Sequence, residues 1–479
     1  MKISEMAKII NKIGSPNIYV DPNQKDFSKI APALMADKIM KTGIIGFDDR
    51  VTYIHTSTHY QYIPEEDTIY LIPLLLDPSI RTNIPSSCIV ECAKRLRLLP
   101  ELQWNLTEEF WNQQFFLNVQ NGVYDIMKQQ LCEHKEEDKF NYVLNFNYQP
   151  HCKLDDAPHF KKFLETSLDE ESSRCLLFTL AYCLSSLTKG RKAFILLGRG
   201  KTGKSTILNL LQSVISSDLV SNEPFYTMGS ERSKAKYIGK RINISRENSN
   251  IPMKHEDSFK SLISNEETSG RNLYENIKYF LPLLKFIFAS NCELNFAHPD
   301  DAVYDRLIII PFNKEIKEED RDIHLDEKLK KEKDIIFSII IDTLKELVES
   351  NYDFHESKEA KEYICQRRML LHSVEDFLDE RAVLDIHGSV PSTELNKLYE
   401  EWCHINNIPA IGRNHLYKHV KDYNKEIRYC KVDSPNGRVN GFSNLRIKSA
   451  EEIEADNVKR NSESNAEPST LTNSETTAE

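Results

Sequence analysis

The chain has 479 residues, of which 40% are hydrophobic and 28% charged, and its formal net charge is −11. This length allows about two to four domains with buried cores. The longest apolar runs fall well short of the roughly 20 residues of a membrane span, no apolar signal segment follows Met1, and the ten cysteines show no framework spacing. We therefore expect neither a membrane-spanning nor a secreted, disulfide-stapled chain, but a cytoplasmic protein with no membrane partner.

The acidic charge is concentrated at the end of the chain. Residues 449–479 contain eight acidic and two basic side chains, whereas residues 411–448 contain nine basic and three acidic ones. Because charge acts locally, a basic module followed by an acidic tail is compatible with DNA binding. The sign of the net charge therefore excludes no nucleic-acid partner.

The sequence predicts two regions in the first part of the chain. Residues 1–75 are expected to form a small α+β region, and residues 76–188 have the apolar spacing of a helical domain. Within the second region, Asn121-Gly122 predicts a tight turn between two extended pieces of Phe115–Tyr124. The expected helices are around Ile30–Thr42, Cys88–Leu98 and Pro158–Ser167, and the expected strands are Val51–His55 and Thr68–Leu74.

The pattern changes at residues 189–313, where apolar strands alternate with helices and loops, as in an α/β domain. Charged amphipathic helices return in residues 314–371. Residues 372–448 predict three helices followed by a hairpin, and the acidic tail 449–479 has too little to bury and is expected to be disordered. The expected strands of the α/β domain are Ala193–Leu197, Arg241–Ser245, Lys285–Ser290 and Leu307–Ile310.

A phosphate-binding loop follows the first of these strands. The pattern G-x-x-x-x-G-K-S spans Gly198 to Ser205 and lies between a buried strand and a helical run. Glycines let backbone N–H groups wrap phosphates, Lys204 would reach the β- and γ-phosphates, and the Ser205 hydroxyl would bind Mg²⁺. The sequence therefore predicts a site for ATP and Mg²⁺ made by Gly198, Gly200, Lys201, Thr202, Gly203, Lys204, Ser205 and Thr206.

Three polar residues after this loop are candidates for catalysis. Glu247 follows a strand and could orient the attacking water or hold Mg²⁺ through water, and Asn291 ends the next buried strand and could bind the γ-phosphate or that water. Arg306 precedes another strand and could reach a phosphate in a neighbouring subunit. Taken singly, the first two could be solvated loop residues and Arg306 a surface ion pair; their order after a phosphate loop favours catalytic roles.

The strings YIGKRINISREN, SLISNEETSGRNLYENIKYF, FIFASNCEL and DDAVYDRLIIIPF follow the loop in this order. They resemble the superfamily 3 helicase domain of the phage and plasmid primase-helicase family, which includes the poxvirus helicase-primase. With the flanking segments, the resemblance covers roughly residues 45–448. It implies an α/β fold with an AAA+ P-loop core, a helical N-terminal region and a C-terminal winged helix.

The resemblance implies that Glu247 is the catalytic acid, Asn291 the sensor asparagine and Arg306 the arginine finger supplied across a subunit boundary. Two positions depart from the family pattern. Ser245-Arg246 stands where a pair of acids is usual, so metal binding rests more on Ser205, and Asp305-Arg306 stands where two arginines are frequent. The roughly 75 N-terminal residues are too few for the primase domain that many members carry, so we expect the helicase half alone.

Two segments carry candidate DNA contacts. Residues 271–280 predict a hairpin, in which Arg271 and Lys278 could neutralise phosphates and Tyr274 could stack on a base; alternatively, its tyrosines pack on the core. Residues 412–421 predict an amphipathic helix with Leu416 and Val420 inward, and a wing with a turn at Pro435–Arg438 follows. A winged helix serves DNA or protein partners. The candidate DNA contacts here are Arg413, His415, Lys418, Lys421 and Arg438.

Together these features predict an ATP-dependent replicative DNA helicase of a phage, plasmid or mobile element, located in the host cytoplasm. It would form a homo-oligomeric ring, most simply a hexamer, act on single-stranded and forked DNA, and work with a separate primase or polymerase. Two alternatives stay open: an origin-binding initiator ATPase that melts DNA without processive unwinding, and a non-enzymatic DNA-binding regulator.

Overall fold

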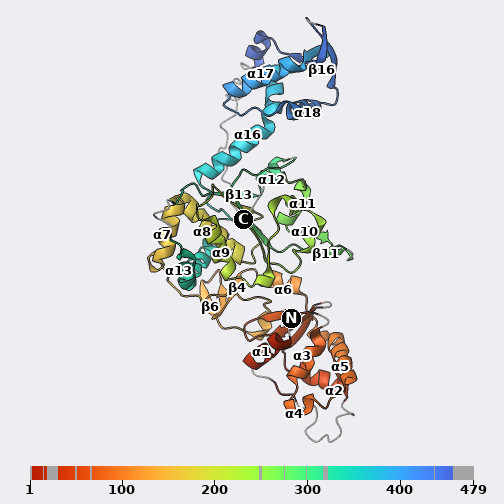
Figure 1. Ribbon diagram of the computed structural model, residues 1–479, viewed down its shortest axis with the longest axis vertical. Coiled ribbons are helices and arrows are strands. Elements are labelled where there is room, and N and C mark those ends of the chain that lie inside the picture. The colour runs from red at the N-terminus through yellow and green to blue at the C-terminus, as the bar shows by residue number, and fades with distance from the viewer. Residues whose placement is uncertain are drawn as a thin grey trace, which may run out of the picture. The chain divides into compact units, whose positions relative to one another are not determined.

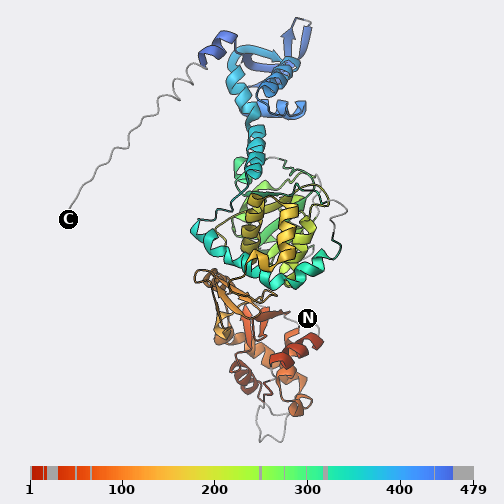
Figure 2. The same cartoon turned by 90° about the vertical axis from the view of Figure 1, so that its left-hand side faces the viewer.

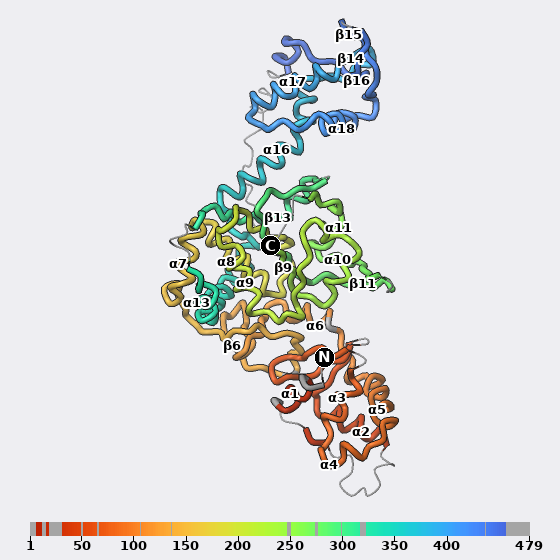
Figure 3. Tube along the Cα trace, in the orientation of Figure 1, coloured from red at the N-terminus to blue at the C-terminus, as the bar shows by residue number. Residues whose placement is uncertain are grey.

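A computed structural model describes residues 3–13, 16–18, 31–48, 51–64, 67–246, 251–273, 276–297, 299–316, 322–435 and 437–456. The chain divides into two compact units, Met1–Ala360 and Lys361–Glu479, which are described separately. Figure 1 shows the ribbon and Figure 3 the Cα trace, both coloured from red at α1 to blue at β16.

The first unit begins with a small lobe in which helices pack on a three-stranded antiparallel sheet, ordered β1-β2-β3. Its core contains Phe47, Ile54 and Leu96, all fully buried. The lobe consists of α1 (Ile3–Ile13), α2 (Pro32–Met40), β1 (Ile45–Asp48), β2 (Val51–His55), β3 (Tyr60–Ile63), α3 (Thr68–Leu75), α4 (Pro78–Arg81), α5 (Ser86–Leu98) and α6 (Leu106–Asn112).

Helix α3 corrects one expectation, because the sequence favoured a strand at Thr68–Leu74. Its buried residues are Thr68, Leu71, Ile72 and Leu75, which is the spacing of one helical face. The segment TIYLIPLL is apolar on nearly every side, so hydrophobic periodicity could not distinguish a short strand from a buried helix. Packing against α1 and α5 stabilises this segment as a helix.

An antiparallel sheet of β4 (Phe116–Val119), β5 (Gly122–Asp125) and β6 (Gln130–Cys132) follows. Val119 pairs with Gly122, which confirms the expected tight turn between two extended pieces. This sheet is joined to α14 (Lys333–Asp342), because the hydroxyls of Tyr124 in β5 and of Tyr148 both donate to the Asp342 carboxylate, at 2.6 and 3.0 Å.

The centre of the first unit is a five-stranded parallel sheet, ordered β13-β7-β12-β9-β8. All four strands expected from the sequence are present, and β8 joins them at one edge. In the turned view of Figure 2, yellow helices in the colour range of α8 and α9 lie in front of the strands. The strands are β7 (Ala193–Leu197), β8 (Val220–Ser221), β9 (Ile242–Ser245), β12 (Lys285–Ser290) and β13 (Leu307–Pro311).

Helices surround this sheet and share one hydrophobic core with it. Helix α8 contacts β12 and β13, and α14 and α15 pack on α8. A short antiparallel pair, β10 (Thr268–Gly270) and β11 (Lys278–Phe280), leaves the sheet between α11 and β12. The helices are α7 (Pro158–Ser167), α8 (Glu170–Leu184), α9 (Lys204–Ser213), α10 (Glu231–Ala235), α11 (Glu256–Ile263), α12 (Asp301–Tyr304), α13 (Leu325–Lys331), α14 (Lys333–Asp342) and α15 (Leu344–Glu349).

Two cations lie together where β9 and β12 begin. The Lys285 side chain is buried and donates to the carbonyl of Leu187, and its amine lies 4.6 Å from the centre of the Tyr182 ring. The Arg241 guanidinium lies 3.5 Å from the centre of the Tyr142 ring. Burial, and then the positive charge of Arg241, lower the pKa of Lys285 to about 7. The folded unit therefore holds a lysine that is easily deprotonated.

We expect Lys285→Met to change the pH dependence of stability. Below pH 7 both folded and unfolded wild-type chains hold the proton, so the folded state carries the full cost of a buried charge. Between pH 7 and the unfolded value of 10.5 the folded chain loses its proton first, so wild-type stability rises with pH, by up to about 1.4 kcal/mol per pH unit. The methionine variant lacks this rise.

Urea denaturation of both proteins from about pH 6 to 8.5 measures the effect, and the difference between them cancels all other titrating groups. The advantage of the variant over wild type should be largest at the acid end and shrink as pH rises. Parallel curves for the two proteins would show that Lys285 does not titrate in this window.

The described residues of the second unit include most of α16 (Lys358–Arg381), the strands β14, β15 and β16, the helices α17 and α18, and a helical stretch at 450–456. Its antiparallel sheet has the order β14-β16-β15, and its core includes Trp402, Leu416 and Phe442. The elements are β14 (Ala382–Pro391), α17 (Ser392–Ile405), α18 (Arg413–Tyr423), β15 (Arg428–Ser434) and β16 (Gly437–Ile447).

Strand β14 was not expected, because three helices and a hairpin were predicted for residues 372–448. Its pairing with β16 shifts register between Leu384 and Ser389, and Ile386 in the shifted stretch is 74% exposed. The irregular register breaks the alternation of apolar and polar residues that marks a strand in a sequence.

The acidic tail also needs a correction at its start, since residues 450–456 are helical rather than disordered. Ser449 and Glu452 form a capping box, in which each backbone N–H donates to the other side chain, at 2.7 and 3.3 Å. The Arg446 guanidinium pairs with both carboxylate oxygens of Glu452, at 2.9 Å each. Residues 457–479 lie outside the described part of the chain.

Candidate nucleotide site

The phosphate loop connects β7 to α9. Lys204 is the first residue of α9 and is buried, and its amine donates to the carbonyls of Gly198 and Arg199, at 2.7 and 2.6 Å. A third bond reaches the Thr202 hydroxyl at 3.2 Å. Burial lowers the pKa of Lys204. The loop thus wraps around a desolvated amine at the start of a helix, where backbone N–H groups attract anions.

Two glycines of the loop are required for different reasons. Gly203 has a φ of +96°, a left-handed conformation that other residues rarely adopt. At Gly198, an added Cβ would lie 2.2 Å from the Phe312 carbonyl oxygen, because β13 passes behind the loop. At Gly200, by contrast, an added Cβ would meet no atom within 4 Å. The motif likewise requires glycine at 198 and 203 and leaves position 200 open.

Gly198→Ala is expected to lower the free energy of unfolding by about 1–3 kcal/mol, since backbone must move to admit the methyl group. The matched change Gly200→Ala should stay within about 0.5 kcal/mol of wild type, because its methyl group enters open space. Denaturation curves of the two variants and of wild type measure these differences in unfolding free energy. Equal stability would mean that β13 does not hold the loop as closely as the structure has it.

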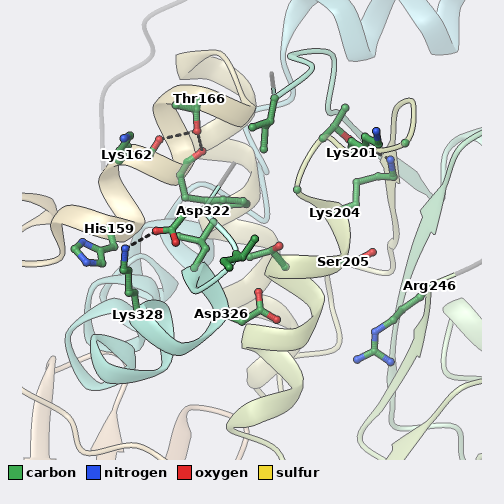
Figure 4. Close-up of a pocket in the computed structure, with 18 of the residues that line it drawn as sticks. His159, Lys162, Thr166, Lys201, Lys204, Ser205, Arg246, Asp322, Asp326 and Lys328 are labelled. Carbon is green, nitrogen blue, oxygen red and sulfur yellow. Dashed lines mark hydrogen bonds and ion pairs between the residues drawn. The ribbon is translucent and has the colours of Figure 1, made fainter. Parts of the chain in front are cut away.

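A cavity of about 710 Å³ opens beside the loop. Seven of the eight predicted nucleotide-binding residues, Gly200 to Thr206, line it, whereas Gly198 begins the loop outside it. The predicted Asn291, which follows β12, also lines it. In Figure 4 the Lys201, Lys204 and Ser205 side chains lie on one side of the cavity and His159, Lys162 and Thr166 of α7 on the other.

Two walls of the cavity were not predicted. One is α7, where the buried Phe163 lies against Gly203, and the other is the segment from Asp322 to Lys328. Lys328 pairs with Asp322 at 2.6 Å, as Figure 4 shows. These residues lie far from the loop in sequence, and no local motif marks them; the packing of α13 on α7 and α9 brings them together.

This cavity has the chemistry to hold a nucleoside triphosphate. Glycines leave room for phosphate against the backbone, Lys201, Lys204 and Arg246 supply positive charge, and the exposed Ser205 hydroxyl is the kind of oxygen ligand that Mg²⁺ accepts. Glu247, the predicted catalytic acid, lies outside the described residues. Strand β9 ends two positions before it, with Arg246 lining the cavity.

Arg306 is not among the described residues that line this cavity. It precedes β13 and its carbonyl accepts from Ala193 at the start of β7, whereas the loop follows the end of β7, about 13 Å away along the strand. Its guanidinium donates to the Ser264 hydroxyl, at 3.1 and 3.3 Å, and to the Ala302 carbonyl at 2.7 Å. Both acceptors are neutral, so these hydrogen bonds are not the surface ion pair that was the alternative for Arg306.

An antiparallel strand pair is present at the expected hairpin, but only β11 lies within the predicted residues 271–280; β10 (Thr268–Gly270) precedes them, and Gly270 lies opposite Lys278. Arg271 forms an exposed ion pair with Glu231 at 3.2 Å, and Lys278 is exposed. Tyr274 lies outside the described residues. Tyr279 is 73% exposed, so it does not pack on the core as the alternative supposed.

In the second unit, α18 buries Leu416 and Val420, as expected. The predicted DNA contacts Arg413, His415, Lys418 and Lys421 are exposed on the same helix. Arg438, in the hairpin of β15 and β16, is exposed and pairs with Asp433 at 3.2 Å. Within this unit these basic residues thus lie at the surface.

Two family models match parts of the chain that line the nucleotide cavity. Residues 78–168 match a family model described as D5 N terminal like, and residues 196–306 match a family of unknown function (DUF5906). A curated protein of Acanthamoeba polyphaga mimivirus, described as a candidate helicase (L207/L206), is 25% identical over 237 residues, which are 47% of this chain and 24% of that protein. These matches support a phage or viral primase-helicase-like family.

The solved apo structure of the NrS-1 C-terminal region has a similar fold, with a TM-score of 0.50 and 14% identity over 88% of this chain and 99% of that one. The D5 N terminal like match contains the α7 wall, and the DUF5906 match contains the phosphate loop, Asn291 and Arg306. The chain spans about a quarter of the mimivirus relative's length. Within the described ranges, no helix is long and apolar enough to cross a membrane.

Proposed function

We propose that this chain is an ATP-driven replicative DNA helicase whose motor is an AAA+ P-loop core of the superfamily 3 type. The observation that carries the proposal is the buried Lys204 amine at the head of α9, beside a 710 Å³ cavity that Ser205 and Asn291 also line. The strand order β13-β7-β12-β9-β8, with the loop after β7, supports a doubly wound nucleotide-binding core.

The proposed cofactors are ATP and Mg²⁺. Mg²⁺ would neutralise charge on the β- and γ-phosphate oxygens, and the Ser205 hydroxyl is the residue that would hold it. The N–H groups of the loop and the Lys204 amine would bind the phosphates, while the Asn291 amide would hydrogen-bond the terminal phosphate or orient the attacking water. Glu247 stays the predicted catalytic acid, which would orient this water or hold Mg²⁺ through water.

The proposed assembly is a homo-oligomeric ring, most simply a hexamer. Arg306 lies where β13 begins, and the loop lies at the opposite ends of the strands. Its guanidinium is therefore remote from the site of its own subunit. An arginine at that edge can stabilise transition-state charge in a neighbour's site, which gives the ring a reason to form.

The proposed nucleic-acid partners are single-stranded and forked DNA. The hairpin of β10 and β11 has exposed Lys278 and Tyr279, the side chains that track phosphates and stack on bases in single-strand binders. In the second unit, the order of helices and strands and the sheet order β14-β16-β15 support a winged helix, with α18 as the helix that contacts duplex DNA.

The α18 contacts lead to a prediction about salt. Replacing Lys418 and Lys421 together with alanine should lower duplex affinity about evenly across sequences and reduce the slope of log affinity against log salt by about 2, because each lysine neutralises one phosphate. Fluorescence anisotropy at several salt concentrations measures both quantities. Replacing Lys397, an exposed lysine of α17, is the matched control. An unchanged slope would assign α18 to a protein partner instead.

The test of the motor itself is ATP hydrolysis by the full chain with and without single-stranded DNA. We expect hydrolysis that needs Mg²⁺ and rises at least severalfold with DNA. Hydrolysis that DNA does not affect would indicate an ATPase that does not translocate on DNA. A complete lack of nucleotide binding would refute the nucleotide site.

A further inference from the structure

Arg246 adds positive charge to the nucleotide cavity, and its position also allows a specific contact with the nucleotide. It is the first residue after β9, and it lines the cavity together with Ser205 and Asn291. Figure 4 shows its guanidinium directed toward α9, on the side of the helix that carries the Ser205 hydroxyl. At the end of a parallel strand beside a phosphate loop, a residue faces the bound ligand.

The charge of Arg246 is not matched by a carboxylate among the described residues. Its hydrogen-bond partner there is the neutral amide of Gln212, near the end of α9, whose oxygen accepts from Nη2. Other cations of the cavity differ: Lys328 pairs with Asp322, and Lys204 is enclosed by loop carbonyls. Lys162 and Lys201 also line the cavity, but Arg246 is the cation that emerges beside Asn291, at the end of a strand of the sheet.

Moving Arg246 from Gln212 to a phosphate is energetically easy. Its present bond joins an exposed guanidinium to a neutral amide, and water can replace such a bond at little cost. A guanidinium bound to phosphate forms charge-assisted, often bidentate bonds that are about twice as strong as neutral ones. A bound anion would therefore draw the side chain away from α9.

The position of Arg246 indicates which phosphate it meets. The loop backbone encloses the phosphates nearest the nucleoside, and the Lys204 side chain reaches outward from them. The ends of β9 and β12, where Arg246 and Asn291 emerge, are adjacent, since Ser245 pairs with Phe288. Together they face the outermost phosphate.

We propose that Arg246 binds the terminal phosphate of a nucleoside triphosphate held in its own subunit, and rests on Gln212 when that phosphate is absent. The site would thereby prefer triphosphate to diphosphate before any neighbouring subunit contributes Arg306. This role of Arg246 rests on the nucleotide binding proposed above, and it adds a contact within the subunit to the one expected across the interface.

Isothermal titration of the full chain with ADP and with the non-hydrolysable β,γ-imido analogue of ATP tests the role without requiring activity. Arg246→Ala should weaken analogue binding about tenfold or more and change ADP binding less than about twofold. Arg246→Lys should recover part of the loss. Arg174→Ala, which removes an exposed arginine of α8 that pairs with Glu346 and is not among the cavity's lining residues, is the control and should change neither affinity.

Changes at Gln212 test the resting position. Gln212→Glu should hold Arg246 in an ion pair and weaken analogue binding several-fold, whereas Gln212→Ala should leave it equal or tighter. The role is refuted if Arg246→Ala weakens both nucleotides equally or neither. Binding of ADP and analogue by wild type with no effect of Arg246→Ala would refute this role alone, whereas no nucleotide binding by wild type would refute the proposed function and this role together.

Discussion

Lys204→Ala is expected to reduce ATP hydrolysis at least about a hundredfold. The Lys204 amine is the buried cation at the centre of the loop, held by the Gly198 and Arg199 carbonyls and the Thr202 hydroxyl. When alanine replaces it, the loop loses these three hydrogen bonds and the charge that neutralises the β- and γ-phosphates. Steady-state hydrolysis with saturating single-stranded DNA measures the loss.

Lys189→Ala is the matched control for this prediction, because Lys189 is exposed and precedes the same strand β7. It should keep nearly full activity. The thermal unfolding midpoint of each variant shows whether a loss of activity reflects a loss of fold. A folded Lys204→Ala protein with undiminished DNA-stimulated hydrolysis would contradict the assignment of the loop.

Arg306→Ala is expected to lower hydrolysis about a thousandfold while nucleotide binding to the isolated subunit is preserved. The reason is positional: Arg306 lies at the start of β13, at the other end of the sheet from the cavity it would serve in the next subunit. Lys192→Ala removes a neighbouring cation, which donates to the Asp305 carbonyl, and should have a much smaller effect.

Mixing the two inactive variants separates a contact across the interface from one within the subunit. An interface between an Arg306→Ala subunit that supplies Lys204 and a Lys204→Ala subunit that supplies Arg306 contains a complete site. Hydrolysis should therefore reappear in mixtures and be greatest at intermediate ratios. If every ratio stays inactive, Arg306 does not act in a neighbour's site.

The elements that could be predicted from sequence are those whose signal is local. Strand β7, the loop and α9 follow one another without interruption, so the motif and its flanking elements could be found together. The hairpin of β4 and β5 was equally evident from Asn121-Gly122. The helix at residues 450–456 also had a local signal, the Ser449 and Glu452 capping box. The polar, acidic composition of the tail predicted disorder instead.

The elements that could not be predicted depend on packing. Helix α3 is too short and too uniformly apolar for its period to be seen, and β14 pairs out of register. In the site, Lys204 and Ser205 are fixed by the loop motif, but Phe163 and Asp322 reach the cavity only because α7 and α13 pack beside α9. Non-local contacts of this kind leave no trace in a single sequence.

Strand separation on a forked duplex tests the central claim most directly. With ATP and Mg²⁺, the full chain should release the labelled strand of a fork with a single-stranded arm, and release should stop with Lys204→Ala or with the non-hydrolysable analogue. Hydrolysis of ATP that the fork stimulates, without any released strand, would contradict a helicase and favour an initiator that melts DNA locally.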